Sequence, residues 1–207
     1  MMNVTLHPSY FPNIAALATM VKADSFEFEV CDNFQKQTYR NRCFIYGANG
    51  KLLLNIPVVH TQKDRKLYKD VLASKDSNWQ SIHWKSLESA YKTSPYFEFY
   101  EDDLRPLFEL KVKYLLDFNL KCLETIFDCL QLDFNYTETS NFEKVLPSNL
   151  DARTLIKSKK EIAQNLTPYT QVFSNKHGFI PNLSVLDLIC NEGPNAFSYL
   201  EEQTIIY

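Results

Sequence analysis

The sequence predicts an α/β fold that begins with a strand–helix–strand unit and continues as a mainly parallel, Rossmann-like sheet. Three observations support this class. Two strand-like segments, 3–6 and 25–30, flank an alanine-rich helical segment at 14–21. A β-hairpin signal follows, and the C-terminal half is largely helical in its periodicity. Because 207 residues are typical of one domain, we expect residues 1–207 to form a single α/β domain.

The first thirty residues predict two parallel strands joined by a helix. The apolar segment 3–6 runs into the loop His7-Pro-Ser-Tyr-Phe-Pro12, where two prolines oppose regular structure. Asn13 is suited to cap the helix that follows. Segment 25–30 then alternates polar and apolar residues, as a strand with one buried face does. In an open α/β sheet, ligands bind beyond the carboxyl ends of such strands, so the two following loops should share one edge.

Candidate catalytic residues follow these two strands. His7 comes directly after the first strand, and Asp32 and Lys36 come after the second. An imidazole or a carboxylate can take a proton from a nucleophile, and a lysine can neutralise developing charge. We therefore predict His7, Asp32 and Lys36 as catalytic residues. The alternative for His7 is a structural side chain that ties its loop down by hydrogen bonds.

A cationic stretch, Lys36-Gln-Thr-Tyr-Arg-Asn-Arg42, precedes the predicted hairpin in a chain whose net charge is −3. Guanidinium groups match phosphate or carboxylate oxygens two at a time. On a strand, Arg40 and Arg42 would share one face and Asn41 would point to the other, so all three can serve one ligand only if the strand bends. We predict that Arg40, Asn41 and Arg42 bind an anionic substrate. The alternative is a solvent-exposed basic segment at the start of a strand.

Turn and helix signals order the middle of the chain. The pair Asn49-Gly50 between apolar segments predicts a β-hairpin over 42–57, because this pair accepts the positive φ angles of a tight turn. Apolar residues recur every three or four positions over 79–91 and again over 104–132. This spacing predicts two helices, the second of them long and starting near Pro106.

A further helix is predicted over 183–190 near the C-terminus. Asn182 is expected to cap it, and the following glycine and proline end it. Asp187 and Asn191 lie four positions apart, hence on one helical face. We predict that both contribute to substrate binding; the alternative is a capping and solvated-face role.

Composition and motifs argue against several function classes. A net charge of −3 disfavours broad nucleic-acid binding. The sequence contains no run of about 18 apolar residues, so we predict no membrane span. The four histidines are scattered, so we predict no metal site. The four glycines, at positions 47, 50, 178 and 193, form neither a GxxxxGK[ST] loop nor a GxGxxG turn. The sequence therefore identifies no cofactor. The N-terminus has no signal-peptide pattern, so we expect a cytoplasmic protein, whose oligomeric state is left open.

Several motifs together resemble the WbqC-like protein family over nearly the whole chain. They are His7-Pro-Ser-Tyr-Phe-Pro12, Lys36-Gln-Thr-Tyr-Arg-Asn-Arg42, Leu54-Asn-Ile-Pro-Val58, Trp84-Lys85 with Ala90-Tyr91 and Ser94-Pro-Tyr-Phe97, Pro168-Tyr-Thr-Gln-Val-Phe173, and Leu183-Ser-Val-Leu-Asp-Leu-Ile-Cys-Asn-Glu-Gly193. The resemblance implies a setting in O-antigen and surface-polysaccharide biosynthesis. A glycine transferase role has been suggested for the family. Tyr10 and Tyr91 lie within these motifs, and we expect both to bind substrate.

Three functions follow from these expectations. The first is a transferase that moves an aminoacyl (glycyl-like) or other acyl group to an activated sugar, with a small molecule or nucleotide-sugar as substrate. The second, suggested by the strand–helix–strand unit, is a nucleotide-using transferase or ligase. The third, suggested by the aromatic segment Tyr96–Tyr100, is a non-catalytic partner in a glycan-assembly complex.

Overall fold

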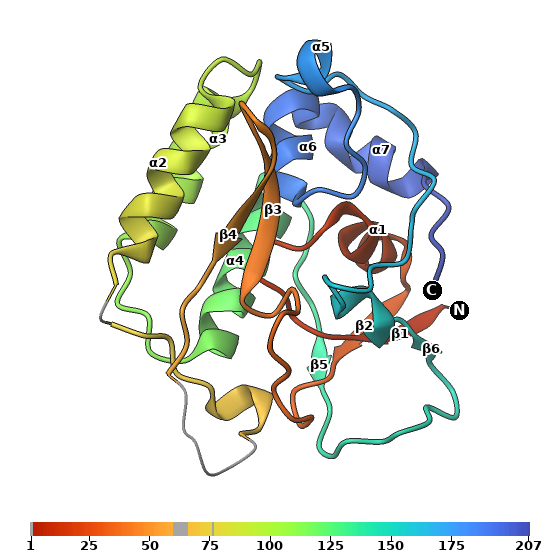
Figure 1. Cartoon of the computed structure of the whole chain (residues 1–207). Coiled ribbons are helices and arrows are strands. Elements are labelled where there is room, and N and C mark those ends of the chain that lie inside the picture. Colours follow the sequence, from red (N-terminus) through yellow and green to blue (C-terminus); the bar gives the residue numbers. More distant parts are fainter. Residues whose placement is uncertain (1, 60–65, 76) are drawn as a thin grey trace.

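The protein, described by a computed structural model for residues 2–59, 66–75 and 77–207, has the predicted α/β class (Figure 1). One sheet has four parallel strands in the order β5-β2-β1-β6, and the second is the antiparallel hairpin β3-β4. The elements in chain order are β1 (Asn3–Leu6), α1 (Ile14–Lys22), β2 (Ser25–Phe28), β3 (Arg42–Gly47), β4 (Gly50–Asn55), α2 (Trp79–Tyr91), α3 (Phe97–Leu104), α4 (Leu115–Cys129), β5 (Thr137–Glu138), β6 (Leu150–Asp151), α5 (Ser174–His177), α6 (Val185–Glu192) and α7 (Ala196–Glu202).

The N-terminal unit and the hairpin confirm two predictions. Strands β1 and β2 pair in parallel and are joined by α1. The Asn13 side chain caps α1 by accepting a hydrogen bond from the backbone N–H of Ala16 at 2.9 Å. In the hairpin, Gly50 has a φ of +98°, a conformation that costs a glycine little and other residues more. The hairpin lies between α2 and α6 (Figure 1).

The prediction of one long helix over 104–132 is wrong. Helix α3 ends at Leu104, a 3-10 turn follows over Arg105–Phe108, and α4 begins only at Leu115. Pro106 has no N–H to continue an α-helical ladder. Between the helices the backbone is extended at Tyr114, which pairs with Leu72, and Lys113 accepts a hydrogen bond from Ala73. Tertiary pairing therefore overrides the apolar spacing here.

The cap of the C-terminal helix also differs from the prediction. Helix α6 begins at Val185, and its N-cap is Ser184, whose hydroxyl accepts from the N–H of Leu186 at 3.3 Å. Asn182 instead accepts from the N–H of Ala15 in α1, at 2.8 Å from its Oδ1 atom. The amide of Asn182 therefore joins two helices.

The parallel sheet has one apolar and one polar face, because side chains alternate along each strand. On the apolar face, Val4, Leu6, Phe26 and Phe28 are buried in the core. On the polar face, the strand register aligns Thr5 with Glu27 on one side and with Asp151 on the other. The segment 139–149, which connects β5 to β6 (Figure 1), reaches this polar face where the Asn149 side-chain amide donates to the Thr5 hydroxyl at 2.9 Å.

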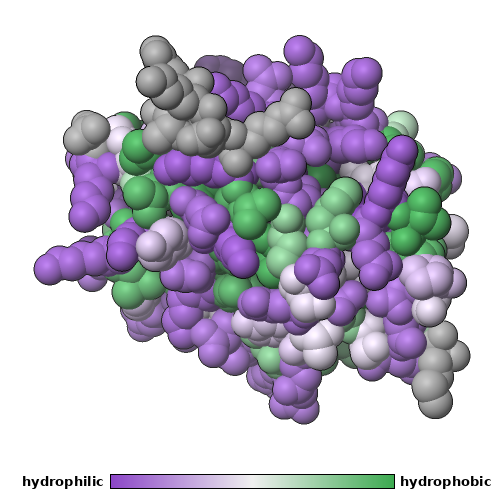
Figure 2. Space-filling model, turned by 90° about the horizontal axis from the view of Figure 1, so that it is seen from below, coloured by the Kyte–Doolittle hydropathy of each residue, from purple (hydrophilic) through white to green (hydrophobic). Residues whose placement is uncertain are grey.

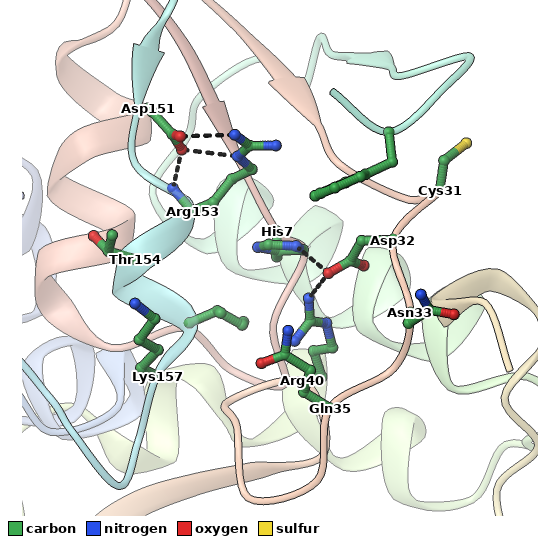
Figure 3. A pocket seen from close by; sticks show the side chains of 12 residues that line it. His7, Cys31, Asp32, Asn33, Gln35, Arg40, Asp151, Arg153, Thr154 and Lys157 are labelled. Atoms are coloured by element: carbon green, nitrogen blue, oxygen red, sulfur yellow. Dashed lines mark hydrogen bonds and ion pairs between the residues drawn. The ribbon is translucent and has the colours of Figure 1, made fainter. Parts of the chain in front are cut away.

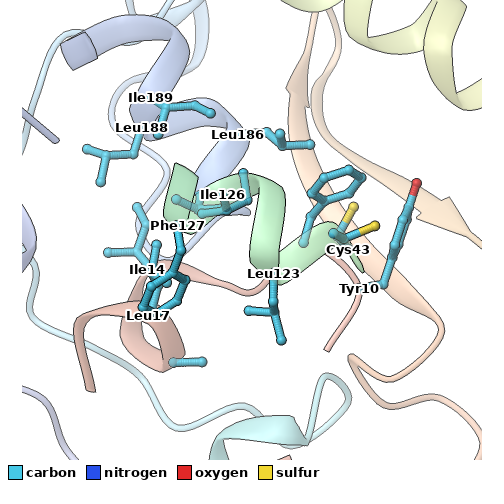
Figure 4. Close-up of a cluster of buried hydrophobic side chains, with 14 of the residues drawn as sticks. Tyr10, Ile14, Leu17, Cys43, Leu123, Ile126, Phe127, Leu186, Leu188 and Ile189 are labelled. Atoms are coloured by element: carbon cyan, nitrogen blue, oxygen red, sulfur yellow. The ribbon is translucent and has the colours of Figure 1, made fainter. Parts of the chain in front are cut away.

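The core joins side chains from α1, α4, α6 and β3, as Figure 4 shows for Ile14, Leu123, Ile126, Leu186 and Cys43. On the face seen in Figure 2, hydrophilic side chains cover most of the surface, and hydrophobic ones appear between them across its middle. Within the part of the chain that the structure describes, no helix is both long and apolar enough to cross a membrane.

Candidate functional site

A cavity of about 290 Å³ lies where β1, β2 and β6 end. The segments that follow these strands carry most of its walls (Figure 3), so the predicted meeting of the first two strand exits is observed. The lining residues are His7, Cys31, Asp32, Asn33, Gln35, Arg40, Phe142, Asp151, Arg153, Thr154, Ile156 and Lys157.

A buried triad of His7, Asp32 and Arg40 forms one wall of this cavity. The Asp32 Oδ2 atom lies 3.0 Å from His7 Nε2, and it also accepts a short hydrogen bond from Arg40 Nη2. Arg40 is only 1% exposed, and its guanidinium lies 5.2 Å from the ring centroid of Tyr68. The single Asp32 carboxylate therefore holds both the imidazole and the guanidinium in place (Figure 3).

His7 is a neutral imidazole with a defined hydrogen position at neutral pH. Burial, assisted by the nearby Arg40 charge and opposed by Asp32, lowers the pKa of His7 from 6.5 to about 4. Because a carboxylate only accepts hydrogen bonds, the ring hydrogen sits on Nε2, which faces Asp32. The Nδ1 atom is then left with a free lone pair, as required of a general base.

Buried polar atoms without partners concentrate at this cavity. Among the described residues, eight buried side-chain nitrogen or oxygen atoms have no hydrogen-bond partner, and four of them belong to cavity-lining residues. Such atoms are rare in folded proteins, because each costs free energy. Their clustering makes this cavity the candidate ligand site among the described residues. The four are His7 Nδ1, Asp32 Oδ1, Arg40 Nε and Thr154 Oγ1.

The opposite wall is built around Arg153. Its guanidinium donates to both Asp151 carboxylate oxygens, at 2.8 and 2.7 Å, and to the Glu143 carbonyl at 2.6 Å. It also lies 3.6 Å from the buried Glu29 carboxylate. Arg153 thus fastens segment 139–149 beside the cavity, and Lys157 adds an exposed ammonium to the same wall.

A buried side-chain amide on α4 supports the triad through hydrogen bonds. The Asn119 side-chain amide donates to the Arg40 carbonyl and to the Tyr68 hydroxyl, each at 2.6 Å. The Tyr68 hydroxyl in turn donates to the carbonyl of Pro8 at 2.7 Å. Three segments that are distant in sequence, those around Pro8, Arg40 and Tyr68, are therefore held by one fully buried amide.

The other predicted residues of the first half lie away from the cavity walls. Lys36 is exposed and does not line the cavity. Asn41 donates to Asn55 Oδ1 and to the Ile56 carbonyl, at 3.1 and 2.9 Å. Arg42 starts β3 and is half-buried. Tyr10 is in the core, where its hydroxyl lies 2.9 Å from His83 Nδ1.

Tyr91, Asp187 and Asn191 form a separate buried cluster, and none of them lines the cavity. The Asp187 carboxylate accepts from the hydroxyls of Tyr91 and Tyr169, at 3.0 and 2.5 Å, and from Gln171 at 2.8 Å. Burial raises the pKa of Asp187, although these hydrogen bonds act against that rise. Asn191 donates to the Asp187 carbonyl at 2.7 Å, so this cluster joins α2, α6 and the segment before α5.

The sequence analysis missed the residues at the end of β6 and directly after it. Asp151, Arg153 and Lys157 line the cavity, and Thr154 contributes an unpartnered hydroxyl. The signal was present in Leu150-Asp-Ala-Arg153, which alternates apolar and polar residues as a strand does. Within the described ranges, no group of three or more histidine, cysteine, aspartate or glutamate side chains is placed to hold a metal ion; His60 lies outside those ranges.

The buried histidines predict a loss of stability in mild acid. Burial lowers the pKa of His83, like that of His7, from 6.5 to about 4. The unfolded chain then binds more protons than the folded one, so stability falls as pH drops from about 6.5 to about 4. Each histidine contributes roughly 2 to 3 kcal/mol to this fall. Urea unfolding at pH 7 and pH 4.5 should show a smaller fall for His83→Gln than for the unaltered protein, and equal falls would contradict the prediction.

Fold and site together define an α/β protein with a polar cavity at the strand ends, built around a histidine–aspartate–arginine triad. The chain belongs to the WbqC-like protein family, whose model matches residues 7–167. This matched range includes every residue that lines the cavity. Searches of curated proteins and of solved structures gave no match.

Proposed function

We propose that this protein is a transferase of surface-polysaccharide biosynthesis that moves an aminoacyl or other acyl group to an activated sugar. The observation that carries the proposal is the unpartnered Nδ1 of a neutral His7, fixed by Asp32 in the wall of the cavity. Membership of the WbqC-like family supports the setting. The acyl donor is an activated ester, thioester or acyl phosphate.

In this reaction, His7 acts as the general base. A hydroxyl or amine of the sugar attacks the acyl carbonyl, and its proton passes to His7 Nδ1 as the new bond to the carbonyl carbon forms. The bond to the leaving group then breaks, and the leaving group departs with the electron pair and takes the proton from His7. Asp32 keeps the imidazole oriented and stabilises the imidazolium that forms in between.

The charges of the opposite wall suit the anionic part of a sugar nucleotide. Arg153 and Lys157 both line the cavity, and Lys157 is exposed to an incoming ligand. Guanidinium and ammonium groups bind phosphate oxygens by charge-assisted hydrogen bonds. We therefore assign the phosphate groups to the Arg153–Lys157 side and the acceptor sugar to the His7–Asp32 side.

The structure gives less support to a purely non-catalytic role. That alternative depends on exposed aromatic side chains in segment 96–100. Phe97 and Tyr100 are buried, and the Phe97 ring stacks on Trp84 with a centroid distance of 5.9 Å. Phe99 is the aromatic residue of this segment that is largely exposed, at 68%.

The proposal is tested by assaying the full chain for acyl transfer. Sugar nucleotides are incubated with glycyl-tRNA, aminoacyl adenylates or acyl-coenzyme A, and the products are examined by mass spectrometry for the added acyl mass. We expect one donor class to give product, and sugar nucleotides to raise the melting temperature. Lys157→Ala should weaken binding of the sugar nucleotide, with Lys36→Ala as the matched control. The proposal would be contradicted if no donor gave product and no sugar nucleotide raised the melting temperature.

A further inference from the structure

We infer that Phe142 is a stacking platform at the cavity, against which a ring of the bound sugar nucleotide lies; the inference rests on the proposed function. Phe142 is the one phenylalanine, tyrosine or tryptophan among the residues that line the cavity, most of which are polar or charged. Its exposed fraction is 53%. All fifteen phenylalanines lie in the described part of the chain, and only Phe99 and Phe142 are largely exposed.

The hydrophobic core does not explain where the Phe142 ring lies. This side chain is neither in the buried hydrophobic cluster nor among the partly buried side chains packed against it. Phe134, eight residues earlier, does pack against that cluster, with its ring centroid 4.9 Å from that of Phe127. An exposed phenyl group forgoes the stabilisation that burial gives an apolar side chain. Replacing Phe142 should therefore leave the fold and the melting temperature of the free protein nearly unchanged.

Arg153 sets the position of the ring. Its guanidinium carbon lies over the Phe142 ring, 5.5 Å from the centroid. The same guanidinium donates to the carbonyls of Glu143 and Lys144, the two residues after Phe142, at 2.6 and 3.3 Å. Asp151 in turn holds the guanidinium through two hydrogen bonds, at 2.8 and 2.7 Å. One face of the ring is thus covered and its backbone is anchored, while about half of the residue stays open to a ligand.

A sugar nucleotide brings two kinds of ring that suit an open aromatic surface. A nucleobase is flat and stacks through its π-face, whatever its sequence identity. A pyranose presents C–H groups that cover an aromatic ring as other apolar groups do. Arg153 contacts the Phe142 ring and lines the cavity together with Lys157, so a ligand with its phosphates on that side has a ring close to Phe142. The shared chemistry is one ligand ring stacked on the phenyl group.

The test measures affinity by calorimetry on the full chain, with the sugar nucleotide that raises the melting temperature most among UDP-, dTDP- and GDP-linked hexoses. Phe142→Ala is expected to weaken this binding about tenfold or more, as the loss of one stacked ring does. Phe142→Tyr keeps the ring and should bind normally, whereas Phe142→Leu keeps apolar bulk without a flat ring and should lose most of the affinity. Val145→Ala is the matched control, because Val145 lies in the same segment, is 76% exposed and does not line the cavity.

Two fragments of the same ligand identify the stacked ring. The free nucleoside diphosphate carries the base, and the hexose 1-phosphate carries the sugar. Weaker binding of the nucleotide alone to Phe142→Ala assigns the platform to the base, and weaker binding of the hexose phosphate alone assigns it to the sugar. Full affinity of Phe142→Ala or Phe142→Leu for the sugar nucleotide would overturn the inference and leave the proposed transferase intact. If the unaltered chain binds no sugar nucleotide, the proposed function and this inference both fail.

Discussion

Replacing Asp32 by alanine is expected to lower the free energy of unfolding by about 3 to 5 kcal/mol. Arg40 is 1% exposed, and Asp32 is the carboxylate to which its guanidinium donates. Without Asp32 the guanidinium stays buried with its charge uncompensated, because the Asn119 and Tyr68 contacts hold that segment in place. Urea unfolding monitored by circular dichroism gives the measurement.

Asp151→Ala is the matched control for this prediction. Asp151 also pairs with an arginine at the cavity, but its side chain is 43% exposed, so its loss should cost about 1 kcal/mol or less. The double variant Asp32→Ala/Arg40→Met should regain much of the stability, because no buried charge is left unpaired. If Asp32→Ala lowers the free energy of unfolding no more than Asp151→Ala does, the triad does not make this contribution to stability.

Replacing His7 by glutamine is expected to reduce kcat for acyl transfer by about 10²- to 10⁴-fold, on the proposed function. The glutamine amide can still donate to Asp32, so the wall of the cavity should keep its shape. Glutamine offers no basic nitrogen, however, so the proton of the nucleophile has no acceptor at position 7. The affinity for the sugar nucleotide should change far less than kcat, because the phosphate groups are bound on the Arg153–Lys157 side.

His177→Gln provides the control for the histidine variant. His177 lies outside the cavity, and its Nε2 is 3.1 Å from the Ala48 carbonyl. Its replacement should leave both kcat and affinity unchanged. If His7→Gln keeps full activity with the same substrates, His7 is a structural residue that ties its loop to Asp32, and the base must be sought elsewhere in the cavity.

Local signals in the sequence were enough for the first unit of the fold. The alternation in 25–30, the capping Asn13 and the proline-bounded loop after His7 are short-range patterns, and the structure has the strands and helix they predict. Parallel pairing of β1 and β2 then brings His7 and Asp32 to one edge. Two of the three predicted catalytic residues therefore meet, whereas Lys36 is exposed away from them.

The arginines show where strand-based reasoning stops. A shared face for Arg40 and Arg42 requires both to lie on one strand, but β3 begins at Arg42 and Arg40 lies in the turn before it. Released from the strand geometry, Arg40 points inward to Asp32. A turn one residue longer or shorter changes the direction of the side chain completely, and the sequence pattern does not define its end that closely.

The sequence by itself determined the α/β class, the strand exits that carry His7 and Asp32, and the family, because each depends on patterns a few residues long. Only the tertiary structure decided that the residues after β6 close the cavity, that Arg40 and not Arg42 joins the triad, and that Asp187 belongs to another buried cluster. The physical reason is that β6 pairs with β1 across more than half of the chain. Such contacts depend on the packing of the whole molecule, which no local pattern encodes.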